Sequence, residues 1–190
     1  NPNPRNTIEL ADKHGLSLAA AADRALDAPA RPIAPPVRSA YRLTRLPYAK
    51  HSPETFTTES AHKNAANRRR AAMMLSAYEK GTPVLDAEYP VQAIRLGKDL
   101  CFLALGGEVV VDYALRAKQE FPREDLIVAG YCNDVMGYIP TAKILREGGY
   151  EPRDSTVYYG QPGPFAESIE ELIFRAIHQV MGDVGAHAKN

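Results

Sequence analysis

Two short apolar runs in the middle of the chain end abruptly at small residues, and this pattern constrains the fold most. The first run, residues 101–105 (CFLAL), is followed by Gly106-Gly107-Glu108, and the second, residues 126–129 (LIVA), by Gly130-Tyr131-Cys132-Asn133-Asp134. Apolar runs of this length bounded by turn residues are typical of buried strands. Because sites in open α/β sheets form beyond the carboxyl ends of strands, the two strand ends predict one shared site.

The pattern along the whole chain predicts an α/β fold, a mixed sheet flanked by helices that is part of a larger α/β domain. We expect helices over residues 6–26, 53–80 (broken near Ala61), 109–121, 141–147 and 165–181, and strands over 37–46, 90–96, 100–105, 126–129 and 156–159. A turn at Gly97-Lys98-Asp99 joins two of these strands as a hairpin. Helices and strands that are mixed in this way are typical of α/β proteins.

Proline-rich sequence divides this pattern into segments. We expect an N-terminal helix over 1–27, a Pro-rich linker over 28–36, an α/β portion over 37–182 and a flexible tail over 183–190. The linker is interpreted as a plain connector, with a PxxP-type partner site as the alternative.

Charge and hydropathy exclude some classes of function. The chain has 190 residues, and 23 basic side chains balance 23 acidic ones, so nothing in the total indicates binding to nucleic acid or to an anionic membrane. The basic run Arg68-Arg69-Arg70 is expected to be the solvated face of a helix. No apolar run approaches the roughly 20 residues of a membrane-spanning helix, so we expect no transmembrane segment.

Cysteine and histidine give no complete metal motif. Cys101 and Cys132 are interpreted as small buried hydrophobic residues, with a disulfide between neighbouring strands as the alternative. Two cysteines alone are too few for a zinc site. The five histidines do not cluster along the sequence and are expected not to be ligands; they are His14, His51, His62, His178 and His187.

Glu108, Tyr138 and Tyr150 are the residues with candidate chemistry. Glu108 follows two glycines and precedes an expected helix. It is either a carboxylate at a helix N-terminus, which the macrodipole favours, or a metal ligand or general base that the glycines allow another group to approach. Tyr138 and Tyr150 each follow glycine in an expected loop, and each is either a packing residue or part of the shared site.

The order of these motifs resembles one known family. The motifs are Gly107-Glu108, Gly130-Tyr131-Cys132-Asn133, Gly137-Tyr138-Ile139-Pro140-Thr141, Tyr150-Glu151, Ser155-Thr156 and Tyr159-Gly160. Together with their spacing they resemble the C-terminal part of the catalytic domain of the neutral/alkaline non-lysosomal ceramidases. The resemblance covers roughly residues 91–180.

The resemblance implies a zinc-dependent amidase that hydrolyses the N-acyl bond of ceramide. In that family two His, one Glu and one Tyr hold Zn²⁺, and a further Tyr supports the oxyanion. Glu108 and Tyr138 resemble the Glu and Tyr ligands, and Tyr150 resembles the oxyanion tyrosine. The resemblance also implies a lipid amide substrate reached at a membrane surface, a role in sphingolipid metabolism, and an extracellular or periplasmic location.

No segment of this chain resembles the parts of the family that carry the two His ligands. The resemblance therefore implies that a missing N-terminal half supplies them. The alternative is a non-catalytic α/β interaction module that lacks a complete metal site and uses its Tyr-rich loop to bind a partner.

Overall fold

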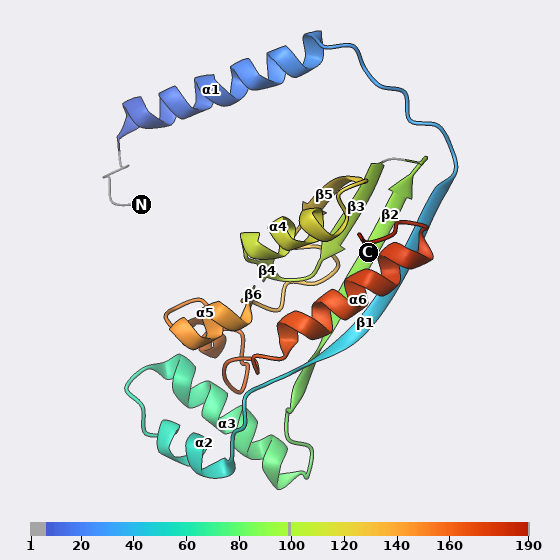
Figure 1. Ribbon diagram of the computed structural model, residues 1–190. Coiled ribbons are helices and arrows are strands. Elements are labelled where there is room, and N and C mark those ends of the chain that lie inside the picture. Colours follow the sequence, from blue (N-terminus) through green and yellow to red (C-terminus); the bar gives the residue numbers. More distant parts are fainter. Residues whose placement is uncertain (1–6, 99, 190) are drawn as a thin grey trace. The chain divides into compact units, whose positions relative to one another are not determined.

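The computed structural model describes residues 7–98 and 100–189, and the chain divides into two compact units after Ile33 (Figure 1). The first unit contains α1 (Ile8–Asp27), and the Thr7 hydroxyl oxygen caps it by accepting a hydrogen bond from the backbone N–H of Leu10. The expected helix start at Asn6, the turn residue Asp99 and the chain end at Asn190 lie outside the described residues. Within the described ranges, no helix combines the length and apolarity needed to cross a membrane.

The second unit is built on a mixed four-stranded sheet, which confirms the predicted α/β class. The strand order is β1–β2–β3–β5, with β1 at Val37–Pro47, β2 at Asp86–Leu96, β3 at Leu100–Leu105 and β5 at Asp125–Ala129. β2 is antiparallel to both β1 and β3, whereas β3 and β5 are parallel. A parallel pair needs a crossover connection, and α4 (Val111–Glu120) lies within it.

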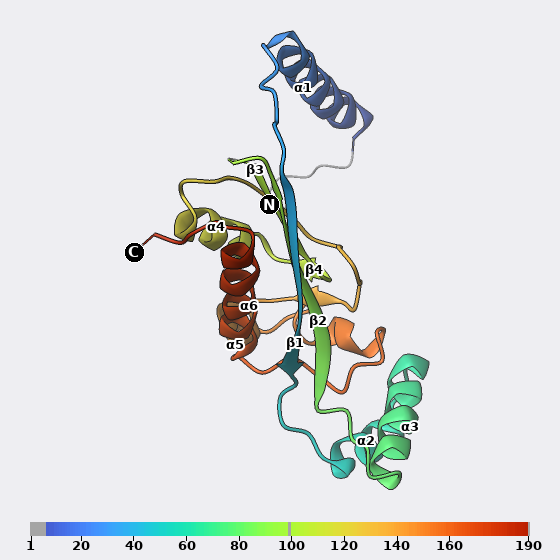
Figure 2. The same cartoon turned by 90° about the vertical axis from the view of Figure 1, so that its right-hand side faces the viewer.

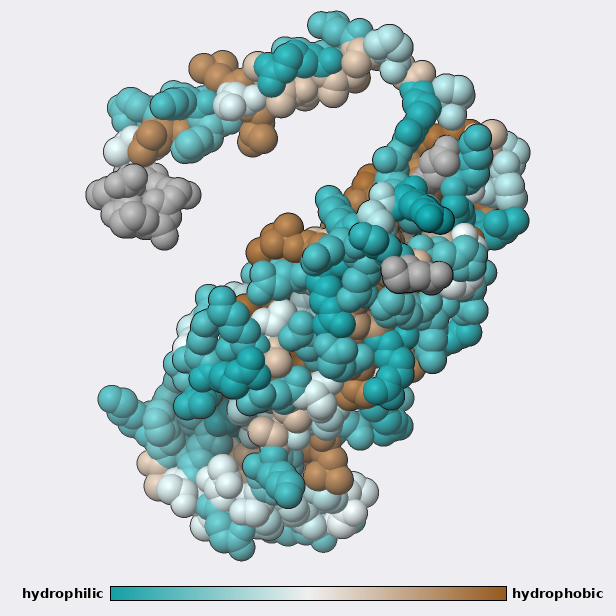
Figure 3. Space-filling model, in the orientation of Figure 1, coloured by the Kyte–Doolittle hydropathy of each residue, from teal (hydrophilic) through white to brown (hydrophobic). Residues whose placement is uncertain are grey.

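Two helices cover one face of this sheet and enclose the core. α6 (Ile169–Asp183) packs on β1 and β2, and α4 packs on β5 (Figures 1 and 2). The buried side of α6 consists of Ile169, Ile173, Phe174, Ile177, Val180 and Met181, and it faces Val91, Ala93, Leu103 and Leu105 of the sheet. Each large apolar side chain buried in this way contributes about 1.5–3 kcal/mol. The outer surface over α4 and α6 is mostly hydrophilic (Figure 3).

A helical hairpin between β1 and β2 has a small core of its own. The predicted break is confirmed, because α2 (Pro53–Glu59) and α3 (Ala65–Glu79) are separate helices. Phe56, Ala71 and Met74 form the separate cluster between them. The expectation that all three arginines of the basic run are solvated is wrong for Arg70, whose side chain is 15% exposed and forms an ion pair with Glu59.

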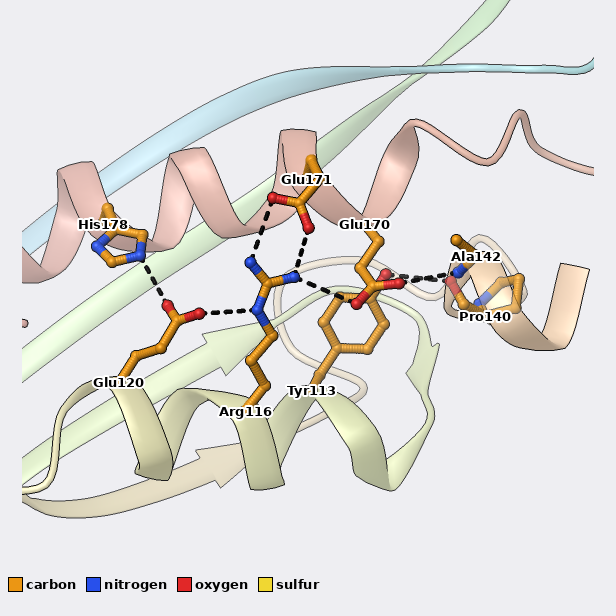
Figure 4. A network of polar contacts seen from close by, with 8 residues as sticks. All are labelled: Tyr113, Arg116, Glu120, Pro140, Ala142, Glu170, Glu171 and His178. Carbon is orange, nitrogen blue, oxygen red and sulfur yellow. Dashed lines mark hydrogen bonds and ion pairs between the residues drawn. The ribbon is translucent and has the colours of Figure 1, made fainter.

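A network of charged side chains connects α4 to α6 and to α5 (Ala142–Glu147), as Figure 4 shows. Arg116 of α4 donates to Glu120 at 2.8 Å and to Glu171 of α6 at 2.6 Å, and its guanidinium carbon lies 3.7 Å from the centre of the Phe174 ring. The guanidinium lowers the pKa of the Glu171 carboxyl. Glu170, which also accepts from Arg116, accepts the first backbone N–H of α5 at 2.9 Å. The network therefore fixes where α5 begins.

Two expected elements differ in the structure. The helix expected from residue 109 begins at Val111, because Glu108 and Val109 form a short strand, β4. Glu108 is therefore on a strand rather than in the first turn of α4. The strand expected over 156–159 is instead the 3₁₀ helix η1 (Asp154–Val157). Its Ser155 and Thr156 hydroxyls donate to the backbone oxygens of Glu151 and Arg153, at 2.7 and 2.6 Å, and such local bonds favour turns over strands.

The C-terminal segment also differs from the flexible tail that was expected over 183–190. Gly185 has a φ of +84°, a left-handed conformation that turns the chain back after α6. Val184 and Ala186 are each 1% exposed and pack in the main core. The backbone N–H of Lys189 donates to the Glu120 carbonyl at 2.8 Å. Apolar burial therefore orders a segment that short-range sequence signals predict to fray.

We predict that Glu124→Leu destabilises the fold by about 3–5 kcal/mol, because it leaves a buried Arg95 without its partner. The two side chains are 10% and 7% exposed and 3.1 Å apart. Arg95→Met with Glu124→Leu replaces the pair by apolar groups, so the double variant should lose less stability than the single one. Urea unfolding of the single and double variants measures both values.

The control is the exposed pair Arg45–Asp86, with side chains 70% and 32% exposed. Asp86→Asn should cost less than about 1 kcal/mol, as for surface pairs generally. If Glu124→Leu cost no more than Asp86→Asn, burial of the pair would have no energetic consequence.

Candidate functional site

The ends of the two apolar strands meet in a small second sheet. β4 (Glu108–Val109) pairs in parallel with β6 (Tyr138–Ile139), and Glu108 and Tyr138 are opposite each other in the register. Opposite residues on paired strands project to the same side. The structure thus brings together two residues that the sequence analysis assigned to one site. β6 itself was not predicted, because two residues are too few to give a periodic signal.

Gly107 makes this pairing sterically feasible. Its φ is +65°, and a Cβ atom there would lie 2.7 Å from the Gly137 carbonyl oxygen and 2.7 Å from Cγ1 of Ile139. Three backbone hydrogen bonds of 2.8 Å hold the approach: Gly107 N–H to Asp134, Glu108 N–H to Gly137, and Tyr131 N–H to Gly107. A side chain at position 107 would separate the two strands that present Glu108 and Tyr138.

The loop after β5 is held in an uncommon conformation. Tyr131 and Asn133 have φ values of 57° and 66°. Asn tolerates this left-handed region, but a bulky residue such as Tyr seldom adopts it. Such strain costs of order 1–3 kcal/mol and concentrates at functional sites. The bonds from Tyr131 to Gly107 and from the Cys132 N–H to Leu105, at 2.8 and 3.0 Å, maintain it here.

Two further tyrosines complete a cluster around Glu108. The Tyr150 ring packs edge-on against that of Tyr138, with centroids 6.2 Å apart. The ring of Tyr159 lies against Gly137, where a Cβ atom would be 3.3 Å from it. Tyr131, Tyr150 and Tyr159 are 58%, 51% and 46% exposed. We call Glu108, Tyr131, Tyr138, Tyr150 and Tyr159 the tyrosine cluster.

Glu108, Tyr138 and Tyr150 were predicted from the sequence as site residues, whereas Tyr131 and Tyr159 were not. Both are in motifs that the resemblance quoted, next to Gly130 and Gly160. The sequence motifs therefore contain both tyrosines, but only the structure shows that Tyr131 is coupled to Glu108 and that Tyr159 lies against Gly137.

Electrostatics couples the members of the cluster. Hydrogen bonding to the Glu108 carboxylate raises the pKa of Tyr131 to about 12. Partial burial, and then the Glu108 charge, raise the pKa of Tyr138. The negative carboxylate therefore keeps the neighbouring phenols protonated, as hydrogen-bond donors. A protonated phenol next to a carboxylate can orient that carboxylate or donate to an oxyanion.

The cluster offers at most two of the ligands that a catalytic zinc needs. A Glu carboxylate and a Tyr oxygen fit a zinc site as oxygen donors, but such a site usually has three protein ligands. Among residues 7–98 and 100–189, no group of three or more His, Cys, Asp and Glu side chains is placed to hold a metal ion. Two of the described histidines bond elsewhere: His51 to Tyr78 at 2.8 Å, and His178 to Glu120 at 2.7 Å.

Both cysteines are free, so the expected alternative of a disulfide does not occur. Cys101 is fully buried in the core, and burial raises its thiol pKa to about 11. Cys132, in the strained loop, donates to the Gly130 carbonyl at 3.3 Å. A buried thiol with a raised pKa is a poor nucleophile, and Cys101 is therefore structural.

A polar cleft of about 420 Å³ lies between the helical hairpin and η1. Its lining includes His62, Asn67, Arg70, Arg153 and Tyr158. Tyr158 precedes Tyr159 of the cluster, so one loop contributes to both places. The lining contains the cations Arg70 and Arg153 and the carboxylate of Asp154, so a polar ligand fits this cleft better than an acyl chain.

Comparison with known proteins leaves the family of this chain open. No protein-family model, no curated protein and no solved structure matches it.

We predict that Gly107→Ala destabilises the protein by about 2–5 kcal/mol, combining about 1–2 kcal/mol of left-handed backbone strain with about 1–3 kcal/mol of overpacking. Two other glycines separate these effects. Gly81, which follows α3, has a φ of +71° and open space around it, and Gly182 of α6 has open space and ordinary helical geometry. Gly81→Ala should show the strain alone, and Gly182→Ala should stabilise by about 0.5–1 kcal/mol.

Urea unfolding of the three variants gives the comparison. Equal losses for Gly107→Ala and Gly81→Ala would mean that the close approach of β4 to β6 contributes nothing.

Proposed function

We propose that the chain is the C-terminal portion of a ceramidase-like, zinc-dependent amidohydrolase that cleaves the N-acyl bond of ceramide or a related lipid amide. One observation carries the proposal. Glu108, Tyr138 and Tyr150, the residues that the resemblance singles out, come from three separate segments and belong to one cluster. The order of motifs in the sequence does not by itself require this proximity, so the cluster is independent support.

Glu108 and Tyr138 are the residues that would hold the metal. A zinc ion, when bound, supplies Lewis acidity toward the amide carbonyl and toward water. The other two ligands would be histidines of a second polypeptide portion, the N-terminal half that the resemblance implies. Tyr131 orients the Glu108 carboxylate through its hydroxyl, since the two groups are coupled in the structure.

Tyr150 would donate a hydrogen bond to the substrate, because its phenol is half-exposed. In amide hydrolysis, water adds to the carbonyl carbon, the C–N bond breaks, and a carboxylic acid and an amine result. The carbonyl oxygen gains negative charge as water adds, and the Tyr150 hydroxyl would donate to it there. The backbone of Tyr150 is fixed by the Ser155 N–H, which donates to its carbonyl at 2.8 Å. A fixed donor loses little entropy when charge develops.

A second candidate function is a non-catalytic α/β interaction module. It is favoured by the two-ligand cluster and by exposed apolar side chains on the sheet, Tyr41 and Leu43 among them, at 45% and 56% exposure. Zinc content of the enzyme purified from its complete gene separates the two candidates. One zinc per chain supports the amidohydrolase, and a metal-free, inactive protein supports the interaction module.

We predict that Glu108→Ala in that complete enzyme removes zinc and amidase activity and leaves the melting temperature nearly unchanged. The reason is that a half-buried site carboxylate contributes little to the core. The matched control is Glu147→Ala, which removes a carboxylate that is 61% exposed on α5. Inductively coupled plasma mass spectrometry gives the zinc content. A sharp drop in melting temperature with normal activity per folded molecule would make Glu108 a structural residue.

We predict that Tyr150→Phe lowers kcat about 10²–10³-fold, the usual effect of losing one oxyanion donor, and changes KM little. Phe keeps the ring, so the edge-on contact with Tyr138 should remain. Steady-state kinetics on a ceramide substrate with the complete enzyme measures both constants. Tyr158→Phe, next to the cluster and 55% exposed, is the control and should leave kcat unchanged. An unchanged kcat for Tyr150→Phe would leave Tyr150 as a packing residue.

A further inference from the structure

The polar cleft between the helical hairpin and η1 contains no member of the tyrosine cluster, and the proposed function does not use it. Its volume of about 420 Å³ is within the range of small-molecule sites. Three segments line it, namely the hairpin, η1 with the following Tyr158, and the turn at residues 162–164. In Figures 1 and 2 the hairpin lies beside the segment that follows α5, so parts far apart in the sequence meet here.

A buried ion pair fixes the hairpin side of the cleft. Arg70 is 15% exposed, and its Nε donates to the Glu59 carboxylate at 3.0 Å. Glu59 is 10% exposed and also accepts from the side-chain amide of Asn67. Both oxygens of this carboxylate therefore have donors within the hairpin, and its charge balances that of Arg70. A ligand in the cleft would thus meet Arg70 and Asn67 in fixed positions.

A buried hydroxyl joins the two sides of the cleft. Thr156 is 4% exposed, and its hydroxyl accepts from Nη1 of Arg70 at 3.1 Å. The same hydroxyl donates to the backbone carbonyl of Arg153 at 2.6 Å. These two bonds connect α3 to the residue that precedes η1. They hold the backbone of Arg153 beside the cleft while its guanidinium lines it.

The lining presents mainly hydrogen-bond donors. Three N–H groups of Arg70 bond to Glu59 and Thr156, which leaves two for a ligand. Nδ1 of His62 accepts the backbone N–H of Asn64 at 3.1 Å, so the proton of the neutral ring is on Nε2, as a further donor. Among residues 7–98 and 100–189, no side-chain partner satisfies the guanidinium of Arg153.

These donors and their charge favour a phosphate group. Arg70 already has a counterion in Glu59, so Arg153 is the cation of the lining that remains to be paired. Arginine binds phosphate through two parallel N–H bonds. A phosphate ester also has three terminal oxygens, which can accept from both arginines and from His62 at once. A carboxylate has only two oxygens for the same donors.

The acceptors in the lining favour hydroxyl groups on the rest of the ligand. Asp154 contributes a carboxylate, which repels a second anionic group and accepts from a neutral donor. The side-chain nitrogen of Asn67 donates to Glu59, which leaves its oxygen to accept. A ligand with one phosphate and several hydroxyl groups therefore matches both the donors and the acceptors.

We propose that this cleft binds a small phosphorylated polyol, the class to which sugar phosphates belong. The phosphate accepts hydrogen bonds from Arg153, Arg70 and His62. Hydroxyl groups of the ligand donate to Asp154 and Asn67. The ligand contacts the hairpin and η1 together, so it stabilises the folded protein. The site uses no metal ion, and it stands independently of the proposed amidohydrolase.

Isothermal titration calorimetry of the purified protein, with EDTA present, tests the binding. The probes are glucose 6-phosphate, inorganic phosphate, glucose and gluconate. We expect one glucose 6-phosphate per chain, bound at least about tenfold more tightly than any of the other three probes, because it alone has both phosphate and hydroxyl contacts. No binding of glucose 6-phosphate, or tighter binding of gluconate, would overturn the proposal.

Two substitutions of one charge separate a specific site from general attraction. Arg153→Gln should weaken glucose 6-phosphate about 10–100-fold, as the loss of a hydrogen bond to a charged group does. Arg69→Gln is the matched control, because Arg69 is exposed on α3 and is not in the lining. At physiological salt the control should change the affinity less than about twofold. Equal losses in the two variants would reject the site.

Asp154→Ala tests the recognition of hydroxyl groups. It should weaken glucose 6-phosphate and not weaken inorganic phosphate, so the preference between the two falls about tenfold. An unchanged preference would overturn the assignment of a polyol. Circular dichroism checks that each variant is folded.

Sedimentation with phosphatidylcholine vesicles that contain phosphatidic acid distinguishes a lipid phosphate from a soluble one. Binding to these vesicles without binding to glucose 6-phosphate would overturn the proposal of a soluble ligand. Amidase activity in a protein that does not bind glucose 6-phosphate would reject the cleft site and keep the proposed function. Binding by a protein without amidase activity would reject the proposed function and keep the cleft site.

Discussion

The close backbone approach at Gly107 is the constraint on which the arrangement of the cluster depends. β3 ends at Leu105, and the chain must turn within two residues to bring Glu108 alongside β6. A Cβ atom at position 107 would lie 2.7 Å from the Gly137 carbonyl oxygen, so only a residue without Cβ fits there at φ +65°. The same residue accepts the Tyr131 N–H and so also fixes the strained loop. One glycine therefore positions side chains that come from both strand ends.

Contacts among α4, α6 and α5 hold the segment that carries Tyr150. Arg116 of α4 donates a hydrogen bond to Glu170 of α6, and Glu170 also accepts one from the first backbone N–H of α5. α5 ends at Glu147 with Gly148 as its C-cap, and Tyr150 follows two residues after that glycine. Charged side chains therefore connect the core to the segment of Tyr150. They are only partly exposed, so salt screens their ion pairs less than it screens pairs on the protein surface. Tyr150 is exposed, but the helix before it is anchored.

Local signals predicted the elements that depend on local sequence. Residues 101–105 and 126–129 form strands as expected, because short apolar runs between glycine or charged residues have few other ways to bury their side chains. The Gly107-Glu108 and Gly137-Tyr138 motifs indicated two segments that the structure pairs as β4 and β6. Their proximity could be predicted because both follow strands of one parallel pair.

Elements that depend on distant partners could not be predicted in this way. β6 exists only because β4 is opposite it, and η1 replaces an expected strand because its hydroxyls bond to nearby carbonyls. Val184 is ordered by packing in the core, which a sequence window around it does not contain. Tyr131 joins Glu108 through a left-handed backbone that Tyr rarely adopts, so no propensity would have placed it there. In each case contacts within the folded structure, which a local sequence window does not contain, override the local preference.

The tyrosine cluster is joined to two neighbouring strands of the main sheet. β3 leads through Gly106 and Gly107 into Glu108, so the end of that strand places the carboxylate. Asn133, in the same strained loop as Tyr131, donates to the side-chain oxygen of Gln92 on β2 at 3.3 Å. Because hydrogen bonding to Glu108 raises the pKa of Tyr131, the coupling between these two residues depends on both attachments. A change that shifts β2 against β3 would therefore move Tyr131 relative to Glu108.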